Sequence, residues 1–239
     1  MRTSAIGATS SGSLALFWPE QLPADFDQRW VEEPNGLISQ LEGEGKLLLI
    51  DVAAGGDYAL AIFVEEAVPA ELEPYCTLVT KHEKIDVSGP TWFGDIELLT
   101  RDMATLAKPK QLRRPKCSEL AIPLGMYSAE LFSAEYPSHV YEDWLSGLAG
   151  ESEQRWWWVQ TWFASLGIVM MMVFVGCLFF GTRPSVYISL GVSTVLLFIA
   201  WLMSRTSGYK KIQQARLSYA AAHPDFVIRL RKQGSPIHS

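Results

Sequence analysis

Two long apolar runs dominate the C-terminal half of the chain. Residues 156–180 form 25 consecutive positions without a formal charge, and residues 185–204 form another 20. At about 1.5 Å per residue, helices of these lengths measure about 37 Å and 30 Å. A bilayer core is about 30 Å thick, so both runs are long enough to cross it. We therefore expect two transmembrane helices.

The connection between the apolar runs is short and breaks a helix. Gly181, Arg183 and Pro184 supply a flexible residue, a charge and a proline within four positions. So short a link requires the helices to lie antiparallel, as a hairpin. The alternative is a pair of helices buried in a soluble core. It is less favoured because helices at the surface of such a core keep a polar face.

The residues that flank the hairpin predict its orientation. Aromatic residues crowd the membrane-interface positions at one end, where Trp and Tyr are enriched, and basic residues accompany them. Under the positive-inside rule this end is cytoplasmic, so both termini lie in the cytoplasm and the protein crosses the inner (plasma) membrane twice. The apolar stretch at residues 14–18 is too short for a signal-peptide core. The expected interface anchors are Trp156, Trp157, Trp158, Trp162, Trp201, Arg155, Arg205, Lys210 and Lys211.

Residues 1–150 show the shorter hydrophobic pattern of β-strands. Residues 46–52 and 58–64 flank a glycine-containing turn, as in a hairpin. Further candidate strands are residues 13–18, 76–80, 84–87, 91–99 and 126–132, and two short helices are expected at residues 25–40 and 141–148. Seven short strands at this spacing favour a mainly β domain, either an antiparallel sandwich or an open barrel.

The tail after the hairpin predicts one more helix and one more strand. Residues 209–222 favour a helix that Pro224 ends, and residues 226–231 alternate between apolar and polar side chains. We expect this strand at an edge of the N-terminal sheet; the alternative is a frayed tail. The predicted organisation is a cytoplasmic acidic β-rich domain (1–150), an inserted transmembrane hairpin (151–208) and a cytoplasmic basic helix and strand (209–239) that completes the first domain.

Charge and cysteine content agree with this division. Residues 1–150 hold 11 Lys and Arg against 23 Asp and Glu, whereas residues 151–239 hold 9 against 3. The three cysteines, Cys76, Cys117 and Cys177, offer no even-numbered disulfide framework, which favours a reducing compartment for the acidic domain.

Candidate chemistry is sparse. The glycine pairs at residues 43–45 and 55–56 lack the spacing of phosphate-binding loops and are interpreted as turns. His82 and His139 each have carboxylates nearby in sequence, a pattern that suits a general base or half of a metal site but also arises on solvated surfaces. We expect no catalytic residues, no cofactor and no metal.

Two charged segments are candidate contacts for a partner or a lipid headgroup. The basic segment contains Lys108, Lys110, Arg113, Arg114 and Lys116. Its alternatives are a solvated loop, a membrane contact and a nucleic-acid site, and the acidic surroundings argue against nucleic acid. Glu65 and Glu66 begin an acidic segment that is either a solvated connection or a docking surface for a basic partner.

These patterns favour a non-enzymatic, membrane-anchored binding protein. Its cytoplasmic β-domain would engage a protein partner at the inner membrane of a bacterium, as an immunity-type protein or an accessory subunit of a membrane complex. The expected partners are the lipid bilayer and a protein, which includes a second copy of the chain. One alternative is a ligand-sensing effector that oligomerises through its hairpin; another, less favoured, is a membrane-bound enzyme.

Overall fold

The chain divides into two compact units. The computed structural model describes residues 1–100, 117–180 and 183–233. Residues Met1–Tyr136 and Ala220–Ser239 form one unit, here called the two-sheet unit, and Pro137–Tyr219 form the other, the helical unit. The charged segment at residues 108–116 lies outside the described residues.

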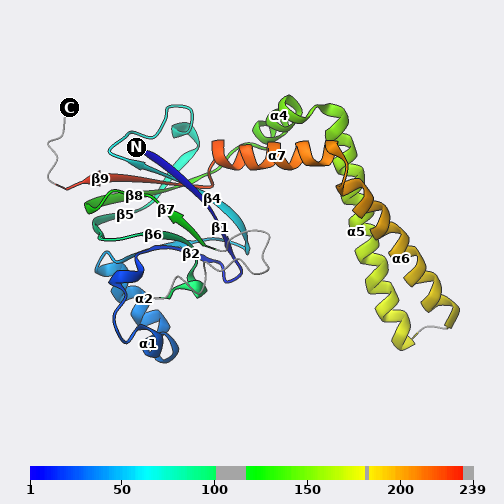
Figure 1. Ribbon diagram of the computed structural model, residues 1–239, viewed down its shortest axis with the longest axis horizontal. Helices are drawn as coiled ribbons and strands as arrows, with labels where there is room; N and C mark the ends of the chain where they lie inside the picture. Colours follow the sequence, from blue (N-terminus) through cyan, green and yellow to red (C-terminus); the bar gives the residue numbers. More distant parts are fainter. Residues whose placement is uncertain (101–116, 181–182, 234–239) are drawn as a thin grey trace. The chain divides into compact units, whose positions relative to one another are not determined.

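The two-sheet unit contains nine described strands (Figure 1). The order in the first sheet is β1-β4-β9-β8-β5, and the order in the second is β3-β2-β6-β7. Their bounds are β1 Arg2–Thr9, β2 Ser13–Phe17, β3 Leu47–Asp51, β4 Gly56–Val64, β5 Cys76–Val87, β6 Thr91–Asp95, β7 Cys117–Leu120, β8 Gly125–Ala134 and β9 Phe226–Lys232. Three short 3₁₀ turns, η1 Pro19–Gln21, η2 Glu73–Tyr75 and η3 Ile96–Leu98, connect some of them.

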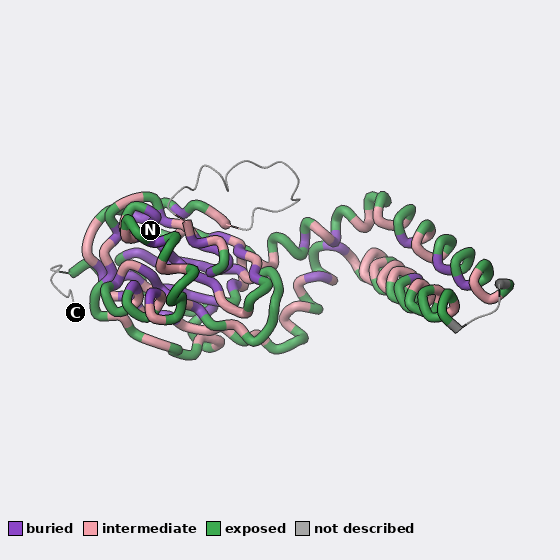
Figure 2. The backbone as a smooth tube through the Cα atoms, turned by 90° about the horizontal axis from the view of Figure 1, so that it is seen from below, coloured by how far each residue is buried: buried purple, intermediate pink, exposed green. Residues whose placement is uncertain are grey.

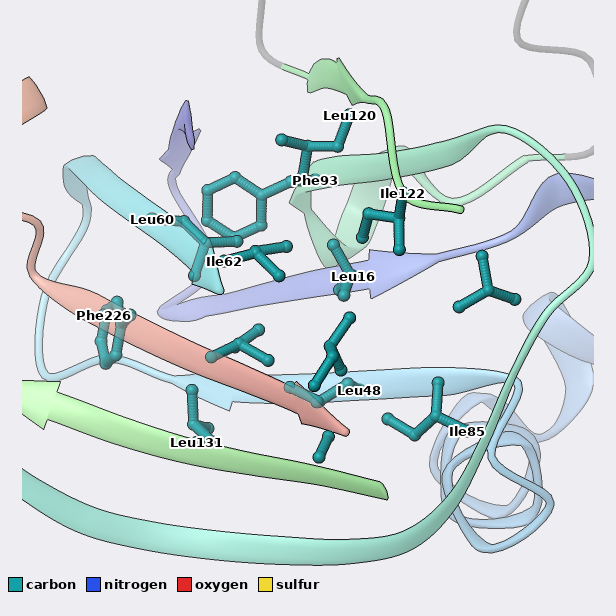
Figure 3. Packing of buried hydrophobic residues seen from close by; sticks show 14 of the residues in the cluster. Leu16, Leu48, Leu60, Ile62, Ile85, Phe93, Leu120, Ile122, Leu131 and Phe226 are labelled. Carbon is teal, nitrogen blue, oxygen red and sulfur yellow. The ribbon is translucent and has the colours of Figure 1, made fainter. Parts of the chain in front are cut away.

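The main core lies between the two sheets. Alternate residues of a strand face the same side, so Leu14, Leu16 and Trp18 of the β2 region point together into this layer. Figure 3 shows Leu60, Ile62, Leu131 and Phe226 from the first sheet packing toward Leu16, Leu48 and Phe93 from the second. Buried segments are concentrated in these strands (Figure 2).

The outer faces of both sheets are covered locally. Helices α1 (Phe26–Glu32) and α2 (Pro34–Gly43) place Phe26, Leu37 and Leu41 against the second sheet. The connection between β4 and β5 places Leu72 beside Phe63 and other outer-face residues of the first sheet. The prediction of one helix over residues 25–40 was wrong in extent: Pro34 lacks an N–H and disfavours the helical conformation at Glu33, whose φ of −148° and ψ of 60° are not helical, so the helix breaks there.

The tail strand β9 has the structure that the alternation predicts but not the predicted position. It lies inside the first sheet, parallel to β4 and antiparallel to β8, rather than at an edge. Val227 and Ile228 are completely buried, which accounts for the apolar side chains on both faces at its start. A parallel pair requires a long crossover, and here the crossover includes the whole helical unit.

The fold class is therefore only partly as expected. Two sheets are present, but one pair of strands is parallel, and the described residues also contain six α-helices, two of them long and apolar. The pattern missed β1 and β7, and it split β5 into two strands because the register of β5 against β8 shifts twice. The structure is a mixed α/β fold that combines two sheets with two long apolar helices.

The helical unit contains α4 (Ser138–Ala149), α5 (Glu151–Phe180), α6 (Arg183–Ser204) and α7 (Ser207–Ala222, to Tyr219 within this unit). Gly150 separates α4 from α5 with φ of +91°, a conformation that glycine adopts without strain. Leu145 and Ala149 of α4 pack against Ile212 and Ala215 of α7. This small cluster fixes α4 and α7 together at the base of the long helices.

Candidate membrane interface

Helices α5 and α6 are long and apolar enough to cross a membrane. The candidate spans are Glu151–Phe179 and Pro184–Ser204, with mean hydropathy of 2.3 and 2.1 over their most apolar windows. Only 6% and 17% of those windows is buried, and both helices are largely exposed or half-buried in Figure 2. A core helix of a soluble protein buries most of its apolar face, so the soluble-core alternative does not fit this exposure.

Small residues bring α5 and α6 close together. The Ser193 hydroxyl of α6 donates a 2.9 Å hydrogen bond to the Gly167 carbonyl of α5. A Cβ atom at position 167 would lie 2.8 Å from the Leu197 side chain, so a larger residue there would require Leu197 or the helices to move. Gly176, further along α5, has nothing within 4 Å of its Cβ position. Gly167 and Ser193 therefore form a close contact between α5 and α6, whereas Gly176 does not.

The expected aromatic anchors differ in their surroundings. Trp156, Trp158 and Trp162 at the start of α5 are exposed, as is Trp201 near the end of α6. Trp157 differs from the rest because it packs partly against the α4–α7 cluster, with the Arg216 guanidinium 5.5 Å from its ring. Four tryptophans are thus available to a membrane interface, and Trp157 belongs to the packing of the helical unit.

The expected basic anchors lie at the same end of the hairpin. The Arg205 guanidinium stacks 4.3 Å from the Trp201 ring centre. Arg155 lies 3.9 Å from Glu151, one turn earlier in α5. Lys210 is exposed, and Lys211 Nζ lies 3.8 Å from Glu153 Oε1. The structure brings these groups together around the start of α5, the end of α6 and the start of α7.

A pocket lies within this arrangement and was not anticipated from the sequence. Its volume is about 320 Å³, at the lower end of the range for ligand pockets. The sequence contained part of the signal: Glu153 and Gln160 are polar residues beside Trp156–Trp158, but they meet Tyr209 only when α5, α6 and α7 are assembled. The pocket is lined by Ser152, Glu153, Trp156, Trp157, Gln160, Met203, Thr206, Gly208 and Tyr209.

The candidate acidic contacts in the two-sheet unit have local partners. Glu65 has a positive φ of 59°, and its carboxylate accepts a hydrogen bond from the Lys232 backbone N–H. Glu66 pairs with the amino group of Met1. Glu65 therefore connects the end of β4 to the end of β9, whereas Glu66 remains half-exposed.

The two candidate histidines are in different settings. His82 Nε2 lies 3.9 Å from Glu42 Oε1, a carboxylate distant in sequence from the ones that the pattern associates with it. His139 is exposed at the start of α4. Within the described ranges, no group of three or more His, Cys, Asp or Glu side chains is arranged to hold a metal ion. Burial and the nearby Glu73 carboxylate raise the pKa of the Cys76 thiol, which opposes thiolate chemistry.

Two carboxylates of the two-sheet unit take part in structural networks. Asp95, almost fully buried, accepts hydrogen bonds from the backbone N–H groups of Ser10 (2.8 Å) and Glu97 (3.1 Å) and from the Ser11 hydroxyl (2.8 Å). Burial raises its pKa, but these hydrogen bonds outweigh burial and hold the pKa below its usual value.

Glu130 lies between two cations on the first sheet. Its Oε2 accepts from Arg229 Nε at 2.7 Å, and its Oε1 lies 3.0 Å from Lys81 Nζ. Burial opposes ionisation, but the hydrogen bonds from Lys81 and Arg229 leave the pKa of Glu130 lowered. Asp225 behaves in the opposite way: burial raises its pKa although the Ala59 N–H donates to it at 2.7 Å.

An exposed apolar pair marks the outermost strand of the first sheet. Leu78 and Val79 of β5 are 45% and 58% exposed. Both face solvent because the pairing of β5 with β8 is interrupted between Leu78 and Thr80, which is a β-bulge at Val79. The bulge therefore displays two adjacent apolar side chains on a strand edge.

Comparison with known proteins gives little further information. No family model matches the chain, and no curated protein matches it. A solved structure described as "Crocagin biosynthetic gene J" aligns with a TM-score of 0.33 and 15% sequence identity, over 56% of this chain and 77% of that chain. A similarity this low says nothing about what the chain does.

Proposed function

We propose that the protein is a non-enzymatic binding protein, anchored in the inner membrane of a bacterium by α5 and α6, with both termini in the cytoplasm. In this proposal the two-sheet unit engages a protein partner at the membrane surface. The observation that carries the proposal is the exposure of two long apolar helices whose aromatic and basic flanks gather at one end.

The distribution of charge supports the orientation. Arg155, Arg205, Lys210 and Lys211 accompany the tryptophan-bearing end of the hairpin, whereas Arg183 is the single charge in the opposite connection. Cytoplasmic loops carry the excess of Lys and Arg. The two-sheet unit, joined to the helical unit through residue 137 on one side and residue 219 on the other, then lies on the cytoplasmic side.

Binding is favoured over catalysis by the roles of the acidic groups. Asp95 and Glu130 are both engaged in hydrogen bonds that join separate strands. An apolar surface offers a place for a partner: exposed Leu78 and Val79 lie side by side on β5. The bulge disrupts the regular backbone pattern that an added strand would need, so we expect a contact through these side chains rather than through strand pairing.

A photoactivatable cross-linker at position 79 of the full chain tests this role in intact membranes. We expect one discrete adduct, reproduced between membrane preparations and lost when Leu78→Lys is added to the same chain. Val31 on α1 is the matched control position because it is a valine that is 82% exposed on another face. No adduct at position 79, or the same adducts at both positions, would contradict partner binding through β5.

A further inference from the structure

The pocket of the helical unit lies where lipid headgroups would be. It is bounded by the first turns of α5, the end of α6 and the start of α7. Trp156 lines it and is 65% exposed, and Trp162 and Trp201 lie on the same end of the hairpin. Tryptophan side chains at both ends of membrane helices occupy the headgroup level. This placement rests on the proposed insertion of α5 and α6 into a bilayer.

The lining of the pocket is suited to a cation. It combines one carboxylate, Glu153, with the aromatic rings of Trp156 and Tyr209. An ammonium over an aromatic face is attracted by the ring electrons, more strongly when it is shielded from water. The amide oxygen of Gln160 adds a hydrogen-bond acceptor. A primary ammonium, with three N–H donors, fits this set of acceptors better than a quaternary ammonium, which has none.

The Glu153 carboxylate retains an oxygen for such a ligand. Its Oε2 accepts from the Ser152 hydroxyl, and the carboxylate also accepts from the backbone N–H of Glu153 itself. Its Oε1 lies 3.8 Å from Lys211 Nζ, too far for a hydrogen bond. The Lys211 side chain is 61% exposed and so remains available to an anion beside the pocket. A carboxylate and a lysine held this way complement a zwitterion whose ammonium and anionic group are only a few bonds apart.

We propose that this pocket binds the headgroup of phosphatidylethanolamine, with the primary ammonium on Glu153 Oε1 and the phosphate on Lys211. Choline headgroups carry a charge of the same sign but cannot donate a hydrogen bond to the carboxylate. Anionic headgroups without an ammonium would meet Lys211 but would be repelled by Glu153. The ordering expected from this chemistry is phosphatidylethanolamine first, with phosphatidylcholine and phosphatidylglycerol weaker.

Native mass spectrometry of the full chain in mild detergent tests the assignment. The probes are phosphatidylethanolamine, phosphatidylcholine and phosphatidylglycerol with identical acyl chains, added at equal concentration. A hydrogen bond to a charged group predicts about a tenfold preference for phosphatidylethanolamine over phosphatidylcholine. Glu153→Gln keeps the shape but replaces the carboxylate by a neutral amide, whose oxygen is a weaker acceptor for an ammonium, so it should clearly lower that preference. Gly208→Leu places a side chain where Gly208 lines the pocket, and it should reduce binding of all three lipids.

Glu151→Gln is the matched control. It removes one carboxylate from the same helical turn, but Glu151 does not line this pocket, so the preference should remain. The proposal is overturned if the unmodified chain shows no headgroup preference, if Glu153→Gln keeps it, or if phosphatidylglycerol binds best. Two separate experiments report on the proposed function: whether the chain stays in the membrane after a carbonate wash, and whether it cross-links at position 79. The order of lipid affinities reports only on the pocket.

Discussion

At the scale of single residues, a few buried polar groups join parts of the fold that are distant in sequence. Asp95 is the last residue of β6 and accepts hydrogen bonds from the turn between β1 and β2, so it connects the two sheets at one end. Its carboxylate also accepts from the Glu97 N–H at the start of η3. Hydrogen bonds to an ionised group stabilise more than those between neutral groups, so we expect Asp95 to contribute strongly to the stability of the two-sheet unit.

Replacing Asp95 by alanine should therefore destabilise the two-sheet unit. We expect Asp95→Ala to lower the free energy of unfolding by about 3 kcal/mol, because it leaves the Ser10 N–H and Ser11 hydroxyl without their acceptor. Chemical unfolding of the full chain in mild detergent measures the change. Asp51→Ala is the matched control, since Asp51 is exposed and accepts one hydrogen bond from Ser13. Equal losses in the two variants would contradict this role.

The same carboxylate predicts a pH dependence of defined sign. The pKa of Asp95 is lowered in the folded protein, so its contribution to stability is complete above the unfolded-state pKa of about 3.9. The contribution is lost as pH falls through the folded-state pKa. The difference in melting temperature between the unmodified chain and Asp95→Ala should thus be largest near neutral pH and shrink below about pH 4. A difference that stays constant from pH 7 to pH 3 would exclude this mechanism.

Individual contacts were the least predictable part of the molecule. The basic charge of the tail does not identify the partner of Arg229. That partner is Glu130, the residue opposite Arg229 where β8 pairs with β9. Register of this kind depends on the tertiary fold, because strands far apart in sequence set it. The interfacial pocket was missed for the same reason, as residues 153 and 209 meet only when α5, α6 and α7 are assembled.

At the scale of elements, the apolar helices were the most predictable and the strands the least. A run of 25 uncharged residues has few structural alternatives. By contrast, the hydrophobic pattern did not predict β1, because residues 2–9 combine small and polar side chains. The buried residues Ala5 and Thr9 are not hydrophobic enough to mark one face of a strand. The bulges of β5 interrupt its alternation and made one strand resemble two.

The packing of α5 on α6 depends on one glycine. Gly167→Val should lower the thermal stability of the hairpin in detergent, because its Cβ would lie 2.8 Å from Leu197 and force the helices apart. Gly176→Val makes the same chemical change in the same helix, at a position with open space. We expect several degrees of destabilisation in the first variant and little in the second. Spectroscopic distances between labels on α5 and α6 should lengthen only for Gly167→Val; the same response in both variants would contradict this packing.

At the scale of the whole molecule, the chain leaves the two-sheet unit for the helices and then returns to it. Residues 137–219 interrupt that unit, and β9 completes the first sheet between β4 and β8. The first sheet can therefore be completed only after the apolar helices have been synthesised. Both ends of the helical unit connect to the two-sheet unit. A hairpin that crosses a membrane twice therefore leaves both of these connections on the same side. The proposed topology is a cytoplasmic two-sheet unit with a membrane-spanning hairpin inserted before its last strand.

The most direct test is the accessibility of single cysteines to a membrane-impermeant maleimide in intact spheroplasts. The three native cysteines are replaced by serine, and cysteine is introduced at Thr182 between the apolar runs, at Val31 on α1, or at Lys210 after the second run. The proposed topology predicts labelling of position 182 in intact spheroplasts, and of positions 31 and 210 only after permeabilisation. Labelling of positions 31 and 210 from outside, or equal labelling of all three, would contradict the account.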